Sequence, residues 1–527
     1  MRFLKAALTS ALCAALLAPV APAAAQPVPR NYPEFTYERV RVEMRDGVSL
    51  SADIYRPVTP KGVKVPVILQ LTPYHVLYKA LDNRETDLPT GDAAFFVPKG
   101  YAYVVADVRG TYNSGGCWDY GGIKERQDGY DLVEWLGTRD WSNGKVAMTG
   151  ASYDGTTANA AAVEQPPHLA TIVPVSAISR WWGYAYQQGA RSTYSGESAD
   201  IDPPSDTPTD FMFAYGFAPP PDPGALGHAD QIAMRWNLCD RVEKALKGYD
   251  TEPDYDEFWQ ERDYLRLAHK VEVPVLVSHG QLDFNVKTWE GTSWFDAVQT
   301  EKAMVLGQWA HASPRGKYAD WDAFLLKWFE RWLYGVRNGV ENEPAVRVQT
   351  NDGKWHLEED WGPDRTAKLR LSGGEVSYFD DGALTESEMT RGLSADRYVR
   401  VEVPKSSGVR IQGRPVLHLE ASSDQASTHF VAVLCDVGPS GGCKVISRAF
   451  MNARYRETLR EGRDLEPGKR YGFDLEFIDK DYVVAGDHHL EVIIASSSDT
   501  WVAPDERRAN NTLYLDDSYL KLPLGRS

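Results

Sequence analysis

Two kinds of hydrophobic pattern follow one another along the chain, and they predict two different domains. Up to about residue 345, short apolar runs alternate with stretches of helical spacing, as in a parallel sheet flanked by helices. Expected strands are 65–71, 101–108, 146–149, 169–175, 274–280 and 303–307, and expected helices are 128–136 and 321–334. From 346 to 527, alternating segments such as 399–403, 416–420, 430–434 and 490–495 are separated by Gly, Pro, Asp and Ser. This second part predicts an antiparallel β-sandwich, specifically a jelly roll.

One segment interrupts the first pattern. Residues 176–269 are rich in aromatic residues, prolines and acids, and the sheet-like periodicity returns only after them. We therefore expect an inserted, mostly helical cap, with the α/β domain formed by 26–175 and 270–345.

The first 25 residues have the three zones of a secretory signal peptide. Arg2 and Lys5 precede an apolar stretch over 6–20, and three alanines lead up to Gln26. We expect cleavage after about Ala25 and export to the periplasm or the medium. The apolar stretch is short for a bilayer span, and no other stretch approaches the roughly 18 residues that one needs, so no membrane association is expected.

Charge and cysteine content narrow the classes of partner. The formal net charge is −17, which disfavours binding to nucleic acid or to anionic membranes. Four cysteines follow the predicted signal, an even number that suits disulfides in an oxidising compartment. Cys435 and Cys443 flank a turn-rich loop and are expected to pair, whereas the pairing of Cys117 with Cys239 stays open.

The segment Gly150–Gly155 carries the strongest chemical signal. It follows the apolar run 146–148 and precedes an Ala-rich helical stretch, the setting of a nucleophile elbow that exposes Ser152 on a strand-to-helix turn. Gly150 supplies the small residue before the serine, but Asp154 occupies the position where a second glycine is usual, and Gly155 comes one step later.

A serine nucleophile needs a base, and the base needs an acid. Asp283 follows the predicted strand 274–280, and His311 lies four residues beyond the strand 303–307, so the order serine, acid, histidine is that of α/β-hydrolases. His279 and His75 are rival bases. Asp154 is a rival acid, although we expect it to cap the following helix.

Two tyrosines are candidates for the oxyanion hole. The first donor is expected from the backbone N–H of Tyr153, the residue after the nucleophile. The loop 72–75 has no run of glycines to present a second N–H, so the hydroxyl of Tyr74 is the candidate. A core tyrosine is the alternative for Tyr74.

Together these segments resemble the Xaa-Pro dipeptidyl-peptidase and cocaine-esterase-like family of α/β-hydrolases. The likeness covers nearly the whole mature chain and rests on 133–135, 141–146 and 150–153 around the elbow, 72–74, 308–311, and 447–456 in the second domain. It implies the same helical cap, the C-terminal jelly roll and an oxyanion hole completed by Tyr74. The acid loop 279–287 resembles the peptidase branch more than the esterase branch.

The resemblance also suggests residues that bind substrate. Segment 179–184 resembles the peptidase segment whose tryptophan and tyrosine bound the proline pocket, which transfers to Trp181 and Tyr184, whereas Trp182 and Tyr186 are expected in the cap core. A dipeptidyl-peptidase must also bind a free ammonium group, and the cap offers Glu197, Asp200 and Asp202 without a basis for choosing among them.

We therefore expect an exported serine hydrolase that releases Xaa-Pro dipeptides from small peptides, with no metal or organic cofactor. An esterase or amidase acting on small acyl esters is the alternative. A binding protein with an inert hydrolase domain is the contrasting class, disfavoured because serine, acid and histidine all occur in order. The sequence does not determine the oligomeric state.

Overall fold

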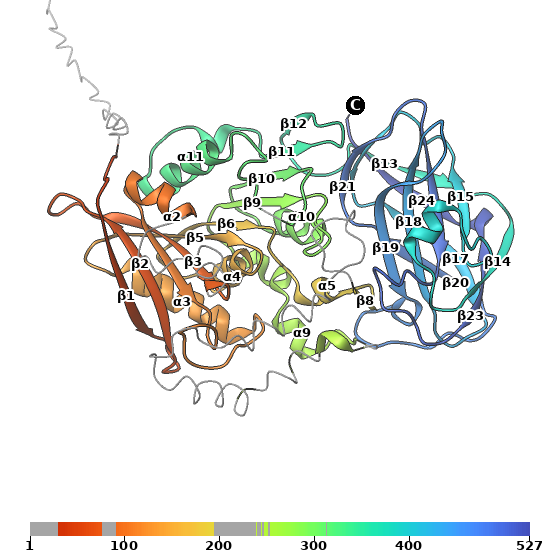
Figure 1. The fold of residues 1–527 in the computed structure, drawn as a ribbon, viewed down its shortest axis with the longest axis horizontal. Helices are drawn as coiled ribbons and strands as arrows, with labels where there is room; N and C mark the ends of the chain where they lie inside the picture. The colour runs from red at the N-terminus through yellow and green to blue at the C-terminus, as the bar shows by residue number, and fades with distance from the viewer. Residues whose placement is uncertain are drawn as a thin grey trace, which may run out of the picture.

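The computed structural model describes residues 30–75, 91–193, 239, 244, 247–250, 253–311 and 313–526. These residues form two bodies side by side, a sheet layered with helices and a β-sandwich (Figure 1). The predicted signal peptide and the cap residues Glu197, Asp200 and Asp202 lie outside the described residues.

The first body is built on a ten-stranded sheet in the order β1-β2-β4-β3-β5-β6-β9-β10-β11-β12. The strands from β4 to β11 run parallel, whereas β1, β2 and β12 are antiparallel to their neighbours. Their bounds are β1 Phe35–Glu43, β2 Ser49–Pro57, β3 Val65–Thr72, β4 Ala102–Asp107, β5 Ser142–Ala151, β6 Leu169–Val175, β9 Val275–Gly280, β10 Lys302–Gly307, β11 Val346–Gln349 and β12 Trp355–Glu358. All six strands expected from apolar runs in this part of the chain are present.

The sheet continues past residue 345, where the second domain was expected to begin. Strand β11 pairs in parallel with β10, and β12 pairs with β11 as a hairpin. The hydrogen bonding of the first sheet thus extends to Glu358, because a short edge hairpin looks in sequence like the start of an all-β domain.

Helices cover both faces of this sheet. Helices α3 (Ile123–Gly137), α4 (Tyr153–Ala162) and α10 (Thr288–Ala297) share one apolar core with the sheet, and α2 (Gly91–Phe96) and α11 (Trp321–Tyr334) share another on the opposite face. Helix α11 has the bounds that its apolar spacing predicts, since one face buries Phe324, Trp328 and Leu333.

The described part of the cap consists of short elements. They are α5 (Trp181–Ala185), the two-stranded pair β7 (Tyr186–Gln187) and β8 (Ala190–Arg191), α9 (Glu257–Glu261), and the 3₁₀ turns η2 (Lys247–Tyr249) and η3 (Tyr264–Lys270). Trp182 and Tyr186 are buried and donate to the carbonyl groups of Pro253 and Lys247, so they belong to the packing of the cap.

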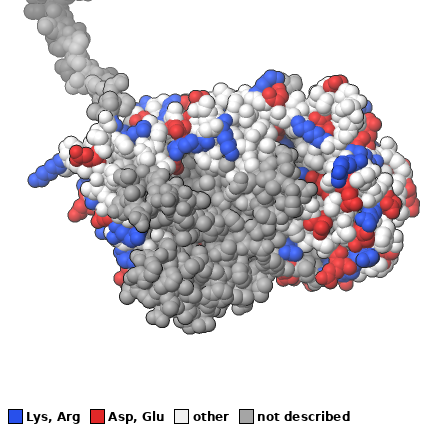
Figure 2. All heavy atoms as spheres, in the orientation of Figure 1, with Lys and Arg blue, Asp and Glu red and all other residues white. Residues whose placement is uncertain are grey.

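The second body is an antiparallel sandwich of an eight-stranded and a four-stranded sheet with an apolar core between them. The larger sheet contains β13 Arg365–Arg370, β14 Glu375–Asp380, β16 Arg410–Gly413, β17 Val416–Ser423, β20 Tyr471–Glu476, β21 Lys480–Val483, β23 Ala509–Tyr514 and β24 Tyr519–Leu524. The smaller contains β15 Val399–Val403, β18 His429–Val437, β19 Lys444–Asn452 and β22 His489–Ala495, and a short helix, α12 (Glu386–Arg391), precedes β15. Acidic and basic side chains are interspersed over the face of the sandwich seen in Figure 2.

Two disulfides are present in the described residues. Cys435 is bonded to Cys443 across the turn between β18 and β19, which is the pairing expected from the sequence. Cys117 is bonded to Cys239, 122 residues away, and this bond ties the loop before α3 to the cap.

Candidate active site

Three parallel strands deliver the predicted chemical groups to one edge of the sheet. Ser152 follows β5, Asp283 follows β9 and His311 follows β10, and the sheet order places β6 between β5 and β9. Because the carboxyl ends of parallel strands lie along the same edge, all three residues belong to one region of the molecule.

The backbone at Ser152 has the strained geometry of a nucleophile elbow. Its φ of 63° lies in the left-handed region, which a non-glycine residue seldom adopts, and its N–H donates to the carbonyl of Val175 at 2.8 Å. A Cβ at Gly150 would lie 2.3 Å from the Cβ of Asp154, and one at Gly155 would lie 2.7 Å from the carbonyl oxygen of Gly150. The turn therefore needs glycine at 150 and 155, and it tolerates aspartate at 154.

The hydroxyl of Tyr74 lies beside the nucleophile. It donates to Ser152 Oγ at 3.1 Å and accepts the N–H of Tyr153 at 3.2 Å. The two donors expected for an oxyanion thus lie side by side next to the serine, and in this structure they are hydrogen-bonded to each other.

Buried partners hold the side chain of Tyr153. Its hydroxyl donates to Glu125 at 2.6 Å and accepts from the indole of Trp118 at 2.9 Å. Burial, reinforced by the nearby Asp119, raises the pKa of Glu125 to about 7. The sequence analysis missed Glu125 and Trp118. The only sequence signals for them are an acid three residues before the predicted helix 128–136 and a tryptophan beside Cys117.

The acid and the base form a close pair. His311 Nδ1 lies 2.7 Å from Asp283 Oδ2, and Asp283 Oδ1 accepts the N–H groups of Asn285 and Val286 at 3.1 and 2.9 Å. The carboxylate is fully buried, whereas the side chain of His311 is 14% exposed. This geometry leaves Nε2 of His311 as the nitrogen that can exchange a proton with a substrate.

The rival histidines have other partners. His279 is fully buried, its Nε2 lies 2.8 Å from the carbonyl oxygen of Val286 and 3.5 Å from Asp283 Oδ2, and burial lowers its pKa. His75 lies between two carboxylates, with Nδ1 2.6 Å from Asp107 and Nε2 3.2 Å from Asp53. Neither geometry suits a general base for Ser152.

The rival acid Asp154 is directed into the core. Its Oδ2 accepts the side-chain amide of Gln70 at 2.6 Å, and Ser152 rather than Asp154 occupies the N-cap position of α4. The prediction that Asp154 caps α4 is therefore wrong, because Asp154 lies within the first turn of the helix and not at its N-cap position.

The two aromatic residues predicted to bind substrate, Trp181 and Tyr184, lie near Tyr153. The rings of Trp181 and Tyr153 are 5.3 Å apart, and Tyr184 lies 6.0 Å from Trp181. The hydroxyl of Tyr184 donates to Asn285 in the acid loop at 3.0 Å. Both side chains are buried, at 0% and 2% exposure, so their contact with a proline ring stays a prediction.

The sandwich holds the acid loop through residues that the sequence analysis did not single out. The N–H of Asp481 donates to Gln281 Oε1 at 2.6 Å, and the ammonium of Lys480 donates to the carbonyl of Gln281. Phe284, directly after the acid, packs edge-on against Trp501 with ring centroids 5.3 Å apart. Strand β21 and the loop that carries Trp501, both in the second body, therefore contribute to the position of Asp283.

The described residues contain no group of three or more His, Cys, Asp or Glu side chains that could hold a metal ion. Within the same residues, no helix has both the length and the apolar character that a membrane crossing requires.

The sheet architecture, the strained serine and the Asp–His pair define a serine hydrolase of the α/β-hydrolase fold. Residues 46–313 match the family model of X-Pro dipeptidyl-peptidases (S15 family), and residues 338–521 match that of the X-Pro dipeptidyl-peptidase C-terminal non-catalytic domain. The chain belongs to this family, the group that includes the CocE/NonD hydrolases.

Individual relatives span nearly the same architecture. A Bacillus anthracis protein, whose name marks it provisionally as an Xaa-Pro dipeptidyl-peptidase, is 30% identical over 91% of this chain and 85% of its own length. Cocaine esterase from Rhodococcus is 26% identical over 87% of this chain and 90% of its own. The crystal structure of a CocE/NonD family hydrolase from Staphylococcus aureus shares the fold with a TM-score of 0.74 at 18% identity, over 93% of this chain and 94% of that one.

Proposed function

We propose that this hydrolase is a dipeptidyl-peptidase that releases Xaa-Pro dipeptides from the free N-termini of peptides. A peptide substrate is what the family implies, and the match to the Bacillus anthracis relative, over 91% of this chain, supports the finer assignment. The chemistry rests on one observation, the hydroxyl of Tyr74 within hydrogen-bond reach of both Ser152 Oγ and the N–H of Tyr153.

The reaction follows from the roles of these groups. Ser152 Oγ attacks the carbonyl carbon after proline while His311 accepts its proton, and Asp283 stabilises the resulting imidazolium. The N–H of Tyr153 and the hydroxyl of Tyr74 bind the oxyanion of the tetrahedral intermediate. His311 then passes the proton to the departing amine, and water hydrolyses the acyl-enzyme by the same steps.

The test compares three substrates on the wild-type protein and on Ser152→Ala. They are Ala-Pro-p-nitroanilide, its N-acetylated form and p-nitrophenyl butyrate. We expect rapid release from the free-amine anilide, a large loss on acetylation, and a loss of at least about 10³-fold in Ser152→Ala. Ser377→Ala is the matched control, because its hydroxyl lies on the sandwich surface against Thr512. Activity confined to the butyrate ester would refute the peptidase assignment.

The second candidate is an esterase or amidase for small acyl esters. The Rhodococcus relative named cocaine esterase favours it, since its similarity also covers both bodies of the chain. The same triad and oxyanion hole would serve this reaction, and the substrate comparison separates the two candidates.

We also propose that the protein is exported and that its signal peptide is removed after about Ala25. The disulfides Cys117–Cys239 and Cys435–Cys443 support this, because disulfides persist in oxidising compartments. Sequencing the N-terminus of the protein from a periplasmic or secreted fraction tests the proposal. A mature chain that begins at Met1 and remains in the cytoplasm would contradict it.

A further inference from the structure

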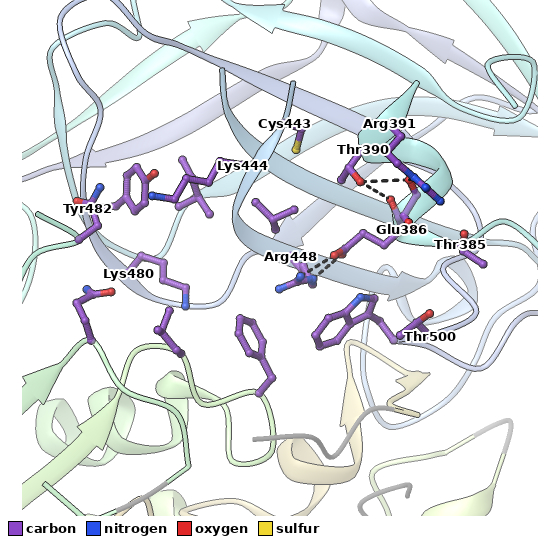
Figure 3. A pocket seen from close by; sticks show the side chains of 18 of the residues that line it. Thr385, Glu386, Thr390, Arg391, Cys443, Lys444, Arg448, Lys480, Tyr482 and Thr500 are labelled. Atoms are coloured by element: carbon purple, nitrogen blue, oxygen red, sulfur yellow. Dashed lines mark hydrogen bonds and ion pairs between the residues drawn. The ribbon is translucent and has the colours of Figure 1, made fainter. Parts of the chain in front are cut away.

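A cavity of about 830 Å³ lies between the acid and histidine loops of the first body and the sandwich. Leu282 and Phe284, the two neighbours of Asp283, line it on one side together with Gln308. Strands β19 and β21 and helix α12 line it on the other side (Figure 3), and Trp501 is also part of the lining. None of its lining residues belongs to the Ser152–Tyr74–Tyr153 cluster, so the cavity is a neighbour of the catalytic groups and is distinct from them.

The charge of the lining is opposite to that of the chain. Its ionisable groups are four cationic side chains, Arg391, Lys444, Arg448 and Lys480, and two carboxylates, Glu386 and Asp481. The lining therefore carries a formal charge of +2 in a chain whose net charge is −17. Such a local reversal favours an anionic ligand.

The carboxylates of the lining are already paired. Glu386 accepts two hydrogen bonds from Arg448, at 2.5 and 2.6 Å, and Asp481 accepts two from Arg410, at 2.7 and 2.6 Å. The guanidinium of Arg448 also lies 3.8 Å from the ring of Trp501, so it fixes an aromatic wall.

Of the two buried cations in this lining, Arg448 is paired with Glu386, whereas Lys480 has no carboxylate partner among the described residues. Its side chain is buried at 3% exposure, and among the described residues no carboxylate lies within ion-pair distance of its ammonium. The ammonium has three donors, and the carbonyl of Gln281 accepts from it. Figure 3 shows Lys480 and Arg448 extending from sandwich strands towards the pocket. Binding of an anion stabilises a buried ammonium of this kind.

We propose that this cavity is a binding site for a carboxylate attached to an apolar group. The carboxylate binds the ammonium of Lys480, and the apolar group packs against the rings of Phe284 and Trp501. The carboxylate can be the C-terminus of a peptide held at Ser152 or that of a separate small acid, and both sources share this chemistry.

The binding depends on pH in a defined direction. Burial, together with repulsion from Arg448, lowers the pKa of Lys480 to about 7, and attraction to Asp283 and Asp479 opposes the shift. The ammonium form is therefore abundant at pH 6 and scarce at pH 8.5. Carboxylate affinity should fall over this interval.

The test is isothermal titration calorimetry with N-acetylphenylalanine and with its neutral amide, which needs no catalytic turnover. We expect the wild-type protein at pH 6 to bind the acid about 10-fold or more tightly than the amide, and Lys480→Met to lose this preference. Lys480→Arg keeps a cation at every pH, so it should retain the preference at pH 8.5, where the wild type loses it. Lys521→Met, at a 41% exposed side chain on β24 that does not line the cavity, is the matched control.

Two results would overturn the proposal: equal affinity for acid and amide in the wild type, or an unchanged preference in Lys480→Met. A cooperative thermal unfolding transition shows that each variant is folded. If Lys480→Met does not fold, the pH dependence of binding to Lys480→Arg still tests the proposal. Inhibition of Ala-Pro-p-nitroanilide hydrolysis by the acid identifies the source of the carboxylate. Competitive inhibition assigns it to a peptide at Ser152, and non-competitive inhibition assigns it to a separate small acid.

Discussion

His75 offers the sharpest test of the electrostatics around the oxyanion loop, because it follows Tyr74 directly and lies between Asp53 and Asp107. Burial alone would lower its pKa, but attraction to Asp107 and Asp53 raises the pKa from 6.5 to about 9. The test substitution is His75→Gln, whose side-chain amide can still donate a hydrogen bond but carries no charge.

A group whose pKa is higher in the folded state than in the unfolded state stabilises the fold when it is protonated. This stabilisation is complete at pH values below the unfolded-state pKa, and it is lost as the pH rises through the folded-state pKa. The shift from 6.5 to about 9 corresponds to about 3 kcal/mol of stabilisation. The side chain is 7% exposed, so solvent screening removes little of this energy. We expect His75→Gln to lower the free energy of unfolding by about 3 kcal/mol more at pH 6 than at pH 10.

The measurement is urea unfolding of wild type and variant at both pH values, followed by tryptophan fluorescence. Comparing the two proteins at each pH cancels the groups that titrate in both. His269→Gln, at an exposed site at the end of η3, is the control and should show no such dependence. A destabilisation by His75→Gln of the same size at pH 6 and pH 10 would show that His75 is not held as an imidazolium.

Three further changes test the site and the fold. Tyr74→Phe removes one oxyanion donor and should lower kcat on the preferred substrate about 100-fold with little change in KM, whereas a change confined to KM would place Tyr74 in substrate binding only. Asp283→Asn leaves His311 without its carboxylate and should lower kcat by about 10⁴-fold, and retention of more than a tenth of the activity would contradict the assignment. Replacing Cys435 and Cys443 together by serine opens a loop with a sequence separation of 8 and should cost about 2 kcal/mol in urea unfolding, with kcat unchanged.

The sequence predicts best what depends on local periodicity. The segments 169–175, 321–334 and 399–403 are elements with the expected bounds, because a strand or an amphipathic helix repeats its pattern over several residues. The same reasoning places Ser152, Asp283 and His311 at strand ends, since the elbow motif and the order of apolar runs suffice for that.

Contacts between single polar residues far apart in the chain could not be predicted in this way. Glu125 bonds to Tyr153 across 28 residues, and Lys480 bonds to Gln281 across 199. Neither Glu125 nor Lys480 belongs to a periodic sequence pattern, so the partner of each is known only from the folded structure. The edge hairpin of β11 and β12 was misjudged for a related reason, because pairing rather than composition decides which sheet a short strand joins.

The hydrogen bonds from the sandwich to Gln281 also have a consequence for folding during synthesis. The chain leaves the ribosome from its N-terminus, so Gln281 emerges about two hundred residues before Lys480 and Asp481. Until β21 has been synthesised and has folded against the first body, the loop that carries Asp283 lacks its hydrogen bonds from the backbone of Asp481 and the ammonium of Lys480. The nascent hydrolase domain therefore completes its acid loop only when almost the entire chain has been translated.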